Sequence, residues 1–318
     1  MAGYKERTRV VISFYDRRTT DHLERLLNRI SQFSAGTQFD PLVVVNSTGE
    51  TRIDPTVAKR AEVLYRENTG MNIGAWHHGW QSDPTFDRYV FLQDECFPIR
   101  NNWLRMIVAP LDDPGIGLVG ESFNPSWDHP WDVLERVHRG SELPGHLIHG
   151  RPANRVAAYL HAMKTWGIDP GLRGQHLRSL VWGLRRDTLD RLGGFPIGAN
   201  YGECIAAEIG VSRAIAAIGQ RLEQVAVQPF YGTAHFEWNA DSPLTSPSHK
   251  KRDKSLGQER SRAELDQEAK VAWDRAVRLA ADQKGDAGII ALLALELKLA
   301  DREKEIARLR GALLKIKQ

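Results

Sequence analysis

Cysteine is scarce in this chain of 318 residues, which contains only Cys96 and Cys204. Two cysteines cannot build a disulfide framework or a zinc site with four cysteine ligands. We therefore expect a reducing, cytoplasmic setting. Each cysteine directly follows a glutamate. We interpret both as small buried apolar side chains, because free cysteine commonly packs in this way, with redox control as the alternative.

Long apolar runs are also missing. No stretch is long enough to span a membrane. The first nine residues, Met-Ala-Gly-Tyr-Lys-Glu-Arg-Thr-Arg, lack the apolar core of a signal peptide. We expect no transmembrane segment, and a peripheral location at the inner face of a membrane is compatible with the sequence.

A strong charge of one sign is absent as well. The formal net charge is +3, with 26 basic against 27 acidic residues before Asp241 and 17 against 13 from there on. A nucleic-acid-binding protein would gather basic residues on one face. The charge balance therefore predicts no nucleic-acid partner.

The chain does contain an alternation of short apolar runs and segments with helical spacing. Strands are predicted at 9–15, 41–46, 61–66, 88–93, 180–186 and 221–227, and helices around 20–30, after Asn72, and at 154–165, 188–192 and 203–218. Such an alternation predicts an α/β fold with a mostly parallel central sheet and flanking helices. Residues 120–177 are less regular and predict loops over a cleft.

The C-terminal part differs from the rest. We predict a body over 1–240, a polar linker over 241–258 and a helical, coiled-coil-like segment over 259–318. Leu292, Leu299, Ile306 and Leu313 recur seven residues apart, as the seam of a coiled coil requires. This seam favours a homo-oligomer or a partner enzyme, and a single helix packed on its own domain is the alternative.

Two segments carry the strongest functional signal. Residues 66–80 turn on Gly70 and Gly74 and open a helix, and residues 89–98 form an apolar strand followed by Asp94 and Glu95. Ligands of open α/β sheets bind at the carboxyl ends of the strands. Carboxylates there, beside a glycine turn that permits close backbone approach, suit a metal-bound diphosphate.

Four segments together resemble the family 2 glycosyltransferases of the GT-A fold, over roughly residues 8–235. Three of them are Val10–Arg17, the turn Asn72-Ile-Gly-Ala-Trp-His-His-Gly79 and Phe91-Leu-Gln-Asp-Glu95 in the place of the family's Asp-x-Asp motif. The fourth is Leu184–Phe195 followed by Tyr201-Gly-Glu-Cys204.

The resemblance implies an inverting transferase that moves a sugar from a nucleotide donor to a hydroxyl of a glycan or lipid-linked acceptor. Bacterial polysaccharide or glycan biosynthesis is the implied setting. The expected nucleotide-sugar contacts are Ser13, Tyr15, Asp16, Asn46, Asn72, Gly74, Gln93 and Asp94.

The chain departs from the family pattern at two positions. Gln93 stands where the first Asp of the Asp-x-Asp motif would be, which leaves Glu95 as the expected ligand of Mn²⁺ or Mg²⁺. Cys204 stands where the family has its general base. Glu203 is therefore the expected catalytic base, with a helix-terminal role as the alternative and Glu208 as a second candidate. We expect Glu208 to pair with Arg213.

The remaining candidates are a histidine and three tryptophans. His235 matches the place where some family members supply a histidine to the metal or diphosphate, and a structural role is the alternative. An aromatic face can pack on the apolar face of a sugar ring. Trp127, Trp131 and Trp182 are therefore expected to bind the acceptor.

Two other functions compete with this interpretation. A sugar-1-phosphate nucleotidyltransferase would need a glycine-rich basic loop after the first strand, and Ser13-Phe-Tyr-Asp-Arg17 contains no glycine. A degenerate transferase that binds sugar or acts as a scaffold is compatible with Gln93 and Cys204.

Overall fold

A computed structural model describes residues 6–47, 53–148 and 151–236. The predicted linker and C-terminal helical segment lie outside these residues, so both stay predictions. Among the described residues, no helix combines the length and the apolar character needed to cross a membrane.

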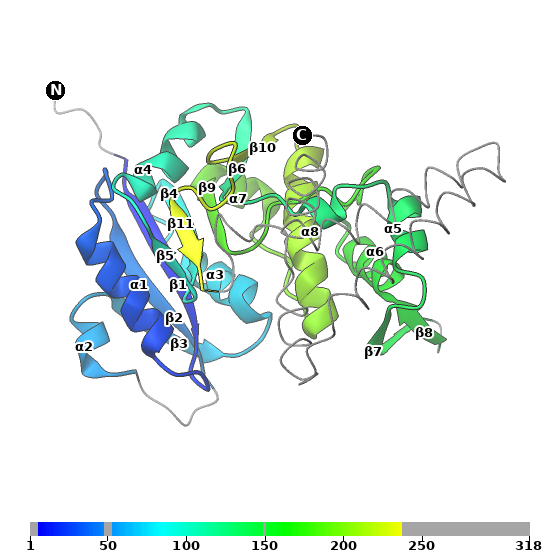
Figure 1. The fold of residues 1–318 in the computed structure, drawn as a ribbon, viewed down its shortest axis with the longest axis horizontal. Helices are drawn as coiled ribbons and strands as arrows, with labels where there is room; N and C mark the ends of the chain where they lie inside the picture. The colour runs from blue at the N-terminus through cyan, green and yellow to red at the C-terminus, as the bar shows by residue number, and fades with distance from the viewer. Residues whose placement is uncertain (1–5, 48–52, 149–150, 237–318) are drawn as a thin grey trace, which may run out of the picture. The chain divides into compact units, whose positions relative to one another are not determined.

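A seven-stranded sheet forms the centre of the fold (Figure 1), with the strand order β10-β6-β9-β4-β1-β2-β3. Its strands are β1 (Thr8–Tyr15), β2 (Asp40–Ser47), β3 (Glu62–Glu67), β4 (Arg88–Gln93), β6 (Ile116–Gly120), β9 (Val181–Arg185) and β10 (Arg221–Gln224). Only β9 runs against its neighbours in this sheet, and the other pairings are parallel. The expectation of an α/β fold with a mostly parallel sheet is confirmed.

Helices cover both faces of the sheet. The faces alternate along each strand, as the pleat requires: Val10 and Ile12 of β1 lie in one apolar cluster and Val11 in the other. The first cluster contains residues of α1 (Asp21–Gln32) and α4 (Trp103–Val108), and the second contains residues of α3 (Met71–Ser82), α7 (Arg186–Leu192) and α8 (Tyr201–Ala217). Figure 1 shows α1 and α3 on opposite sides of β1.

A third apolar cluster extends the molecule beyond the sheet. It joins Leu134 of α5 (Trp131–Val137) and Val156 of α6 (Arg155–Thr165) to Ala206 and Ile209 of α8. Between α5 and α6 lies an antiparallel pair, β7 (Glu142–Ile148) and β8 (Arg151–Asn154). The section expected to be loops therefore contains a short helix and a hairpin besides the predicted helix.

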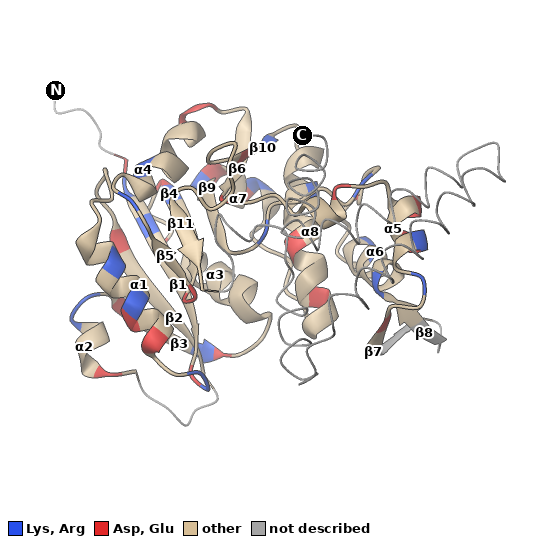
Figure 2. Ribbon diagram, viewed as in Figure 1, with Lys and Arg blue, Asp and Glu red and all other residues tan. Residues whose placement is uncertain are grey.

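A small second sheet pairs β5 (Cys96–Pro98) with β11 (Thr233–His235). The remaining elements are the short helix α2 (Pro55–Ala58) and the 3-10 turns η1 (Ala109–Asp112) and η2 (Pro125–Trp127). Figure 2 shows acidic and basic residues interspersed along α1, so its outer face is not of one charge.

The direction of the strands determines where polar groups gather. β1, β2, β3, β4 and β6 are parallel to one another, so their carboxyl ends lie at one edge of the sheet. We call this edge the carboxyl edge. Asp16, Asn46, Asp94 and Glu121 all stand within two residues of a strand end there.

Candidate active site at the carboxyl edge

Glu95 lies in a polar cluster just after β4. Its Oε1 is 2.8 Å from Nη1 of Arg18, and its Oε2 is 3.6 Å from Nε2 of His235. Burial alone would raise the pKa of the Glu95 carboxyl, but the hydrogen bond from His235 and the charge of Arg18 outweigh it and lower the pKa to about 2. Glu95 is therefore an anion at neutral pH, with one-fifth of its side chain exposed.

Asp94, its neighbour, is more deeply buried. Its backbone N–H donates to the carbonyl of Ser13 at 3.1 Å, and its Oδ2 has no hydrogen-bond partner among the described residues. Burial, with the nearby charge of Glu95, raises the pKa of the Asp94 carboxyl to about 7. A buried polar atom without a partner is uncommon and points to a ligand at this position.

The second sheet fixes His235 beside these carboxylates. His235 pairs with Cys96 across β5 and β11, and the backbone N–H of Phe236 donates to the carbonyl of Glu95 at 2.9 Å. The buried carboxylate of Glu121, which follows β6, accepts hydrogen bonds from the backbone N–H groups of Gly232 and Thr233. His235 therefore lies beside Glu95, and its predicted role at the metal or diphosphate stays a prediction.

Asn46 and Asp16 are engaged within the chain. The Asn46 side chain donates to the carbonyl of Met71 at 2.9 Å and accepts from Arg66 Nη1 at 2.7 Å, so it ties β2 to β3 and α3. Asp16 Oδ2 accepts from Ser47 Oγ at 2.8 Å. Both side chains are buried, which makes them supports of the carboxyl edge in this structure.

The glycine turn before α3 has a steric basis. Gly70 has φ 71°, in the left-handed region that favours glycine. A Cβ at Gly74 would lie 2.0 Å from the carbonyl oxygen of Thr69. Gly74 therefore permits a close approach within the chain itself, and its predicted contact with a nucleotide sugar stays a prediction.

A chain of hydrogen bonds links the glycine turn to the acidic motif. Asn72 Nδ2 and Gln93 Nε2 donate to the carbonyl of Ser179, at 3.0 and 2.6 Å. Ser179 in turn donates its N–H to Glu208 Oε2 at 2.9 Å, and its hydroxyl contacts the same oxygen. Glu208 Oε1 lies 3.0 Å from His176 Nε2.

Glu208 is thereby connected to the carboxyl edge, and its predicted pairing with Arg213 is not what the structure shows. Its hydrogen-bond partners are His176 and Ser179. Burial would raise the pKa of Glu208. The hydrogen bond and charge of His176 and the two hydrogen bonds from Ser179 outweigh it, so the pKa lies below its usual value. The carboxylate is therefore ionised at neutral pH.

Glu203, the predicted catalytic base, is held by hydrogen bonds at the start of α8. Its carboxylate accepts from the backbone N–H of Ala199 at 2.7 Å and from Asn200 Nδ2 at 2.9 Å, while Asn200 Oδ1 accepts from the N–H of Glu203. This arrangement is a variant of the capping box at the start of α8, in which Glu203 accepts from the N–H of Ala199, the residue before the N-cap Asn200. These contacts are the ones expected if Glu203 stabilises the start of the helix, the alternative to a role as catalytic base.

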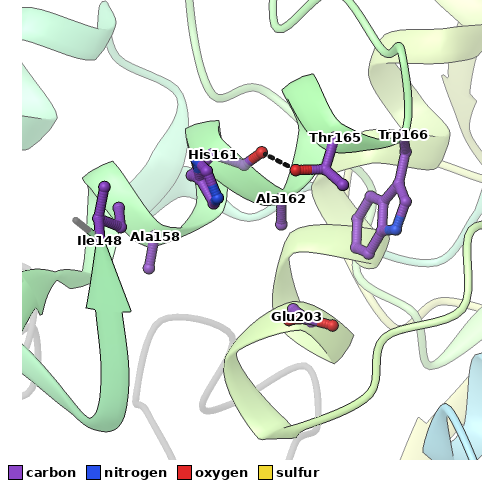
Figure 3. A pocket seen from close by; sticks show the side chains of 7 residues that line it. All are labelled: Ile148, Ala158, His161, Ala162, Thr165, Trp166 and Glu203. Carbon is purple, nitrogen blue, oxygen red and sulfur yellow. Dashed lines mark hydrogen bonds between the residues drawn. The ribbon is translucent and has the colours of Figure 1, made fainter. Parts of the chain in front are cut away.

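Glu203 also lines a cavity of about 250 Å³ between α6, α8 and the end of β7 (Figure 3). The other lining residues are Ile148, Ala158, His161, Ala162, Thr165 and Trp166. None of the lining residues belongs to the carboxyl edge. Glu95 therefore does not line the cavity that contains Glu203.

Two of the three predicted acceptor tryptophans are buried in apolar clusters. Trp182 is fully buried and packs against Trp76 and Phe195, and Trp127 is buried and stacks on His138. Their predicted contact with an acceptor stays a prediction. Trp131 is half-buried, and its N–H donates to the carbonyls of Pro170 and Gly171, so its acceptor role stays untested.

The remaining predicted donor contacts lie on β1. Ser13 is buried and donates to the carbonyl of Leu92 at 3.4 Å, which places it inside the sheet. Tyr15 is half-buried at the strand's carboxyl end. The structure gives neither residue a ligand contact, and both assignments stay predictions.

The donor set fits a divalent cation that a substrate helps to hold. Within the described residues, no group of three His, Cys, Asp or Glu side chains is arranged as a complete metal site. Mg²⁺ commonly binds through one or two carboxylates together with water and substrate phosphates. Glu95 and the unpartnered Oδ2 of Asp94 supply carboxylate oxygens of this kind.

Several residues of the site were not predicted from the sequence. Arg18, Glu121, His176 and Ser179 are far from the motifs or lack a motif of their own. Arg18 had a usable signal, because it follows the first strand by three residues and so reaches the carboxyl edge. The other three sit in segments with irregular sequence, where spacing carries little information.

Comparisons with known proteins concern the fold. No family model and no curated protein matches the sequence. Among solved structures, the chain is similar to a mannosyltransferase from Pyrobaculum calidifontis in complex with GDP-Man and Mn²⁺, with 18% identity, a TM-score of 0.44, and coverage of 70% of this chain and 55% of the other. The chain thus spans about half the length of that protein.

It is also similar to glucosyl-3-phosphoglycerate synthase from Mycobacterium tuberculosis in complex with Mn²⁺, UDP and glucosyl-3-phosphoglycerate. The identity is 17%, the TM-score is 0.42, and 72% of each chain is covered. A third structure is a CMP:2-keto-3-deoxy-manno-octonic acid synthetase complexed with CTP, with 13% identity, a TM-score of 0.38 and coverage of 69% and 89%. Similarity of this extent is no basis for an activity, so the function is argued from the chain's own geometry.

Proposed function

We propose that this chain is a nucleotide-sugar-dependent glycosyltransferase of the GT-A type. The observation that carries the proposal is the position of Glu95, ionised and partly exposed at the carboxyl edge beside Asp94 and His235. Asn72 and Gln93, from two motifs of the family resemblance, donate to one carbonyl there. These contacts support a common site for the two motifs.

In this proposal Glu95 and Asp94 hold a divalent cation with the donor diphosphate, and His235 orients Glu95. The cation neutralises charge on the diphosphate and so makes it a better leaving group. Arg18, half exposed beside Glu95, contributes a second positive charge to the same region.

The proton acceptor in the proposal is Glu208 and not Glu203. Glu208 is linked through Ser179 to Gln93 at the carboxyl edge, whereas Glu203 lines a cavity that contains no residue of that edge. The acceptor hydroxyl oxygen attacks the anomeric carbon, the bond to the diphosphate oxygen breaks, and the proton passes to the Glu208 carboxylate. Attack opposite the leaving group inverts the anomeric centre.

In the proposal the cavity lined by Glu203 and Trp166 binds a part of the acceptor away from the reacting hydroxyl, since neither Glu95 nor Glu208 lines it. Figure 3 shows Trp166 and His161 on the α6 side of this cavity and Glu203 on the α8 side. An indole face and a carboxylate are groups that bind sugars, through stacking and through hydroxyl hydrogen bonds. A glycan in a bacterial polysaccharide pathway is the acceptor class that the family resemblance favours.

A screen of nucleotide sugars tests the proposed function. Each candidate donor is added with and without Mn²⁺, and both the melting temperature and the release of nucleoside diphosphate are measured. A donor should raise the melting temperature, because it binds the native state. Binding without release in the presence of many acceptors would favour the degenerate sugar-binding protein.

A further inference from the structure

Both ring nitrogens of the buried His176 face oxygen atoms. Nδ1 lies 2.7 Å from the backbone carbonyl oxygen of Gly174, and Nε2 lies 3.0 Å from Oε1 of Glu208. A carbonyl oxygen and an ionised carboxylate can only accept hydrogen bonds. A neutral imidazole carries a hydrogen on one ring nitrogen alone, so it can donate to one of these oxygens and not to the other.

Two arrangements of hydrogens satisfy both contacts. Either His176 carries a hydrogen on each ring nitrogen and Glu208 is a carboxylate, or His176 is neutral and a protonated Glu208 donates to Nε2. The other carboxylate oxygen favours the first arrangement. Oε2 accepts from both the N–H and the hydroxyl of Ser179, and such hydrogen bonds stabilise the charged form of a carboxyl.

The surroundings of the pair are compatible with a hydrogen on Nε2 of His176. The Nδ2 of Asn124 lies 3.3 Å from this nitrogen, and half a turn of the amide presents its oxygen there instead. Arg178 and Tyr159 also interact with the charge of Glu208. The positive charge of Arg178 favours an ionised Glu208, as a cationic ring does.

We propose that His176 donates from both ring nitrogens and so holds Glu208 as an oriented carboxylate, which makes it a positioning residue for proton transfer. This inference rests on the proposed function, because it takes Glu208 as the proton acceptor. The carbonyl of Gly174 fixes one side of the ring, and the other side fixes Glu208 Oε1. The Glu208 side chain is 14% exposed, against 1% for His176, so the carboxylate is the group of this pair that a substrate can reach.

The hydrogens on the ring can be observed by NMR in the full chain. A long-range proton–nitrogen spectrum of protein labelled with nitrogen-15 distinguishes a ring with two N–H groups from a ring with one. At pH 8 an exposed histidine is neutral, since its ordinary pKa is about 6.5. His161, exposed on α6, serves as the reference. His176, assigned by the signal missing from His176→Gln, should carry a hydrogen on both nitrogens. A bare Nε2 would overturn the inference.

The pH dependence of turnover separates positioning from a merely structural role. His176→Phe removes both donors, so the protonation of Glu208 should move upward by roughly one to two pH units, the shift expected for losing a hydrogen bond to a charged group. The loss of kcat/KM relative to the wild type should be small at pH 8 and several-fold at pH 4.5. Taking this ratio removes effects common to both proteins, such as that of Asp94. His176→Gln keeps one donor for Glu208 and should lose less.

Failure of the inference differs from failure of the proposed function. If His176→Phe and His176→Gln both lower kcat/KM by the same factor at every pH, His176 only supports the surrounding fold, and the inference is overturned while the function stands. If the wild type releases no nucleoside diphosphate from any donor, the proposed function falls. The NMR spectrum still decides where the hydrogens of His176 lie, and it does so even if His176→Phe fails to fold.

Discussion

Asn72 and Gln93 donate side-chain hydrogen bonds to the same acceptor, the carbonyl oxygen of Ser179, at 3.0 and 2.6 Å. One residue opens α3 and the other ends β4, so this carbonyl joins the glycine turn to the acidic motif. Gln93 stands where the family has an aspartate. Its amide serves here as a hydrogen-bond donor, which a carboxylate cannot do at neutral pH.

Restoring the family residue at this position should therefore harm the protein. Gln93→Asp places a carboxylate against the Ser179 carbonyl and should lower the free energy of unfolding by roughly 1–3 kcal/mol, the cost of an unsatisfied buried polar group. Denaturant unfolding measures it. Gln93→Asn, which keeps an amide, is the matched control and should lose less. A Gln93→Asp protein as stable as the wild type would contradict this role.

The raised pKa of Asp94 predicts a stability that depends on pH. The folded-state pKa is about 7 against an ordinary value of 3.8, so the folded state holds a proton that the unfolded state releases. Stability is therefore lost as the pH rises from about 3.8 through 7. Asp94→Asn cannot ionise and avoids this loss.

In metal-free buffer, Asp94→Asn should be more stable than the wild type at pH 8, and this advantage should shrink as the pH falls to 4.5. Thermal unfolding of both proteins across this range measures the effect. A difference between the two proteins that is the same at every pH would mean that burial of the Asp94 charge is not its cause.

Changing each of the two glutamates of α8 to glutamine should affect a different property, kcat for Glu208 and the free energy of unfolding for Glu203. Glu208→Gln should lower kcat by roughly 10²–10⁴-fold, the usual contribution of a general base. Glu203→Gln should lower the free energy of unfolding by about 1 kcal/mol, since it weakens the capping box.

The pH profile separates a base from a merely structural residue. The pKa of Glu208 is lowered, so its protonation should give wild-type kcat/KM an acid limb that lies below the effect of Asp94, whose pKa is about 7. Glu208→Gln should lose this acid limb along with the rate. If Glu203→Gln abolishes turnover and Glu208→Gln does not, the proton acceptor is Glu203.

The cavity beside Glu203 makes a prediction about the acceptor. Trp166→Leu should raise KM for a glycan acceptor roughly two- to tenfold, because an aromatic stacking contact is worth roughly 0.5–1.5 kcal/mol. The KM for the donor should not change. Trp131→Phe is the comparison, since Trp131 is half-buried but does not line the cavity. Equal KM values in both variants would remove the acceptor from this cavity.

The strands that hold the site could be predicted from the sequence because their apolar runs are long and buried. β1, β2 and β4 are confirmed to within one or two residues. β6 was not predicted, since Ile116–Gly120 is short and contains two glycines. Gly117 has a packing reason: a Cβ there would lie 2.5 Å from Ile215. Such tertiary reasons leave no local periodicity.

The residues of the site that could be predicted are those whose position follows from the strand order and direction alone. Asp94 and Glu95 follow a strand, so the rule for carboxyl ends located them. Gln93 contacts Ser179, which lies 86 residues further along the chain, and Ser179 contacts Glu208, 29 residues beyond it. No local pattern encodes such contacts. Trp182 packs in the core, and an indole on a strand has the same sequence signature there as in a binding site.

The central claim is that Glu95 serves transfer from a nucleotide sugar, and its most direct test is Mn²⁺-dependent release of nucleoside diphosphate by Glu95→Gln. The control is Glu135→Gln, an exposed glutamate of α5 outside the site. Wild type and control should release the diphosphate with Mn²⁺, and Glu95→Gln should be slower by about 100-fold or more, since metal stabilisation of the leaving group is worth several kcal/mol. Equal rates in all three proteins would contradict the claim.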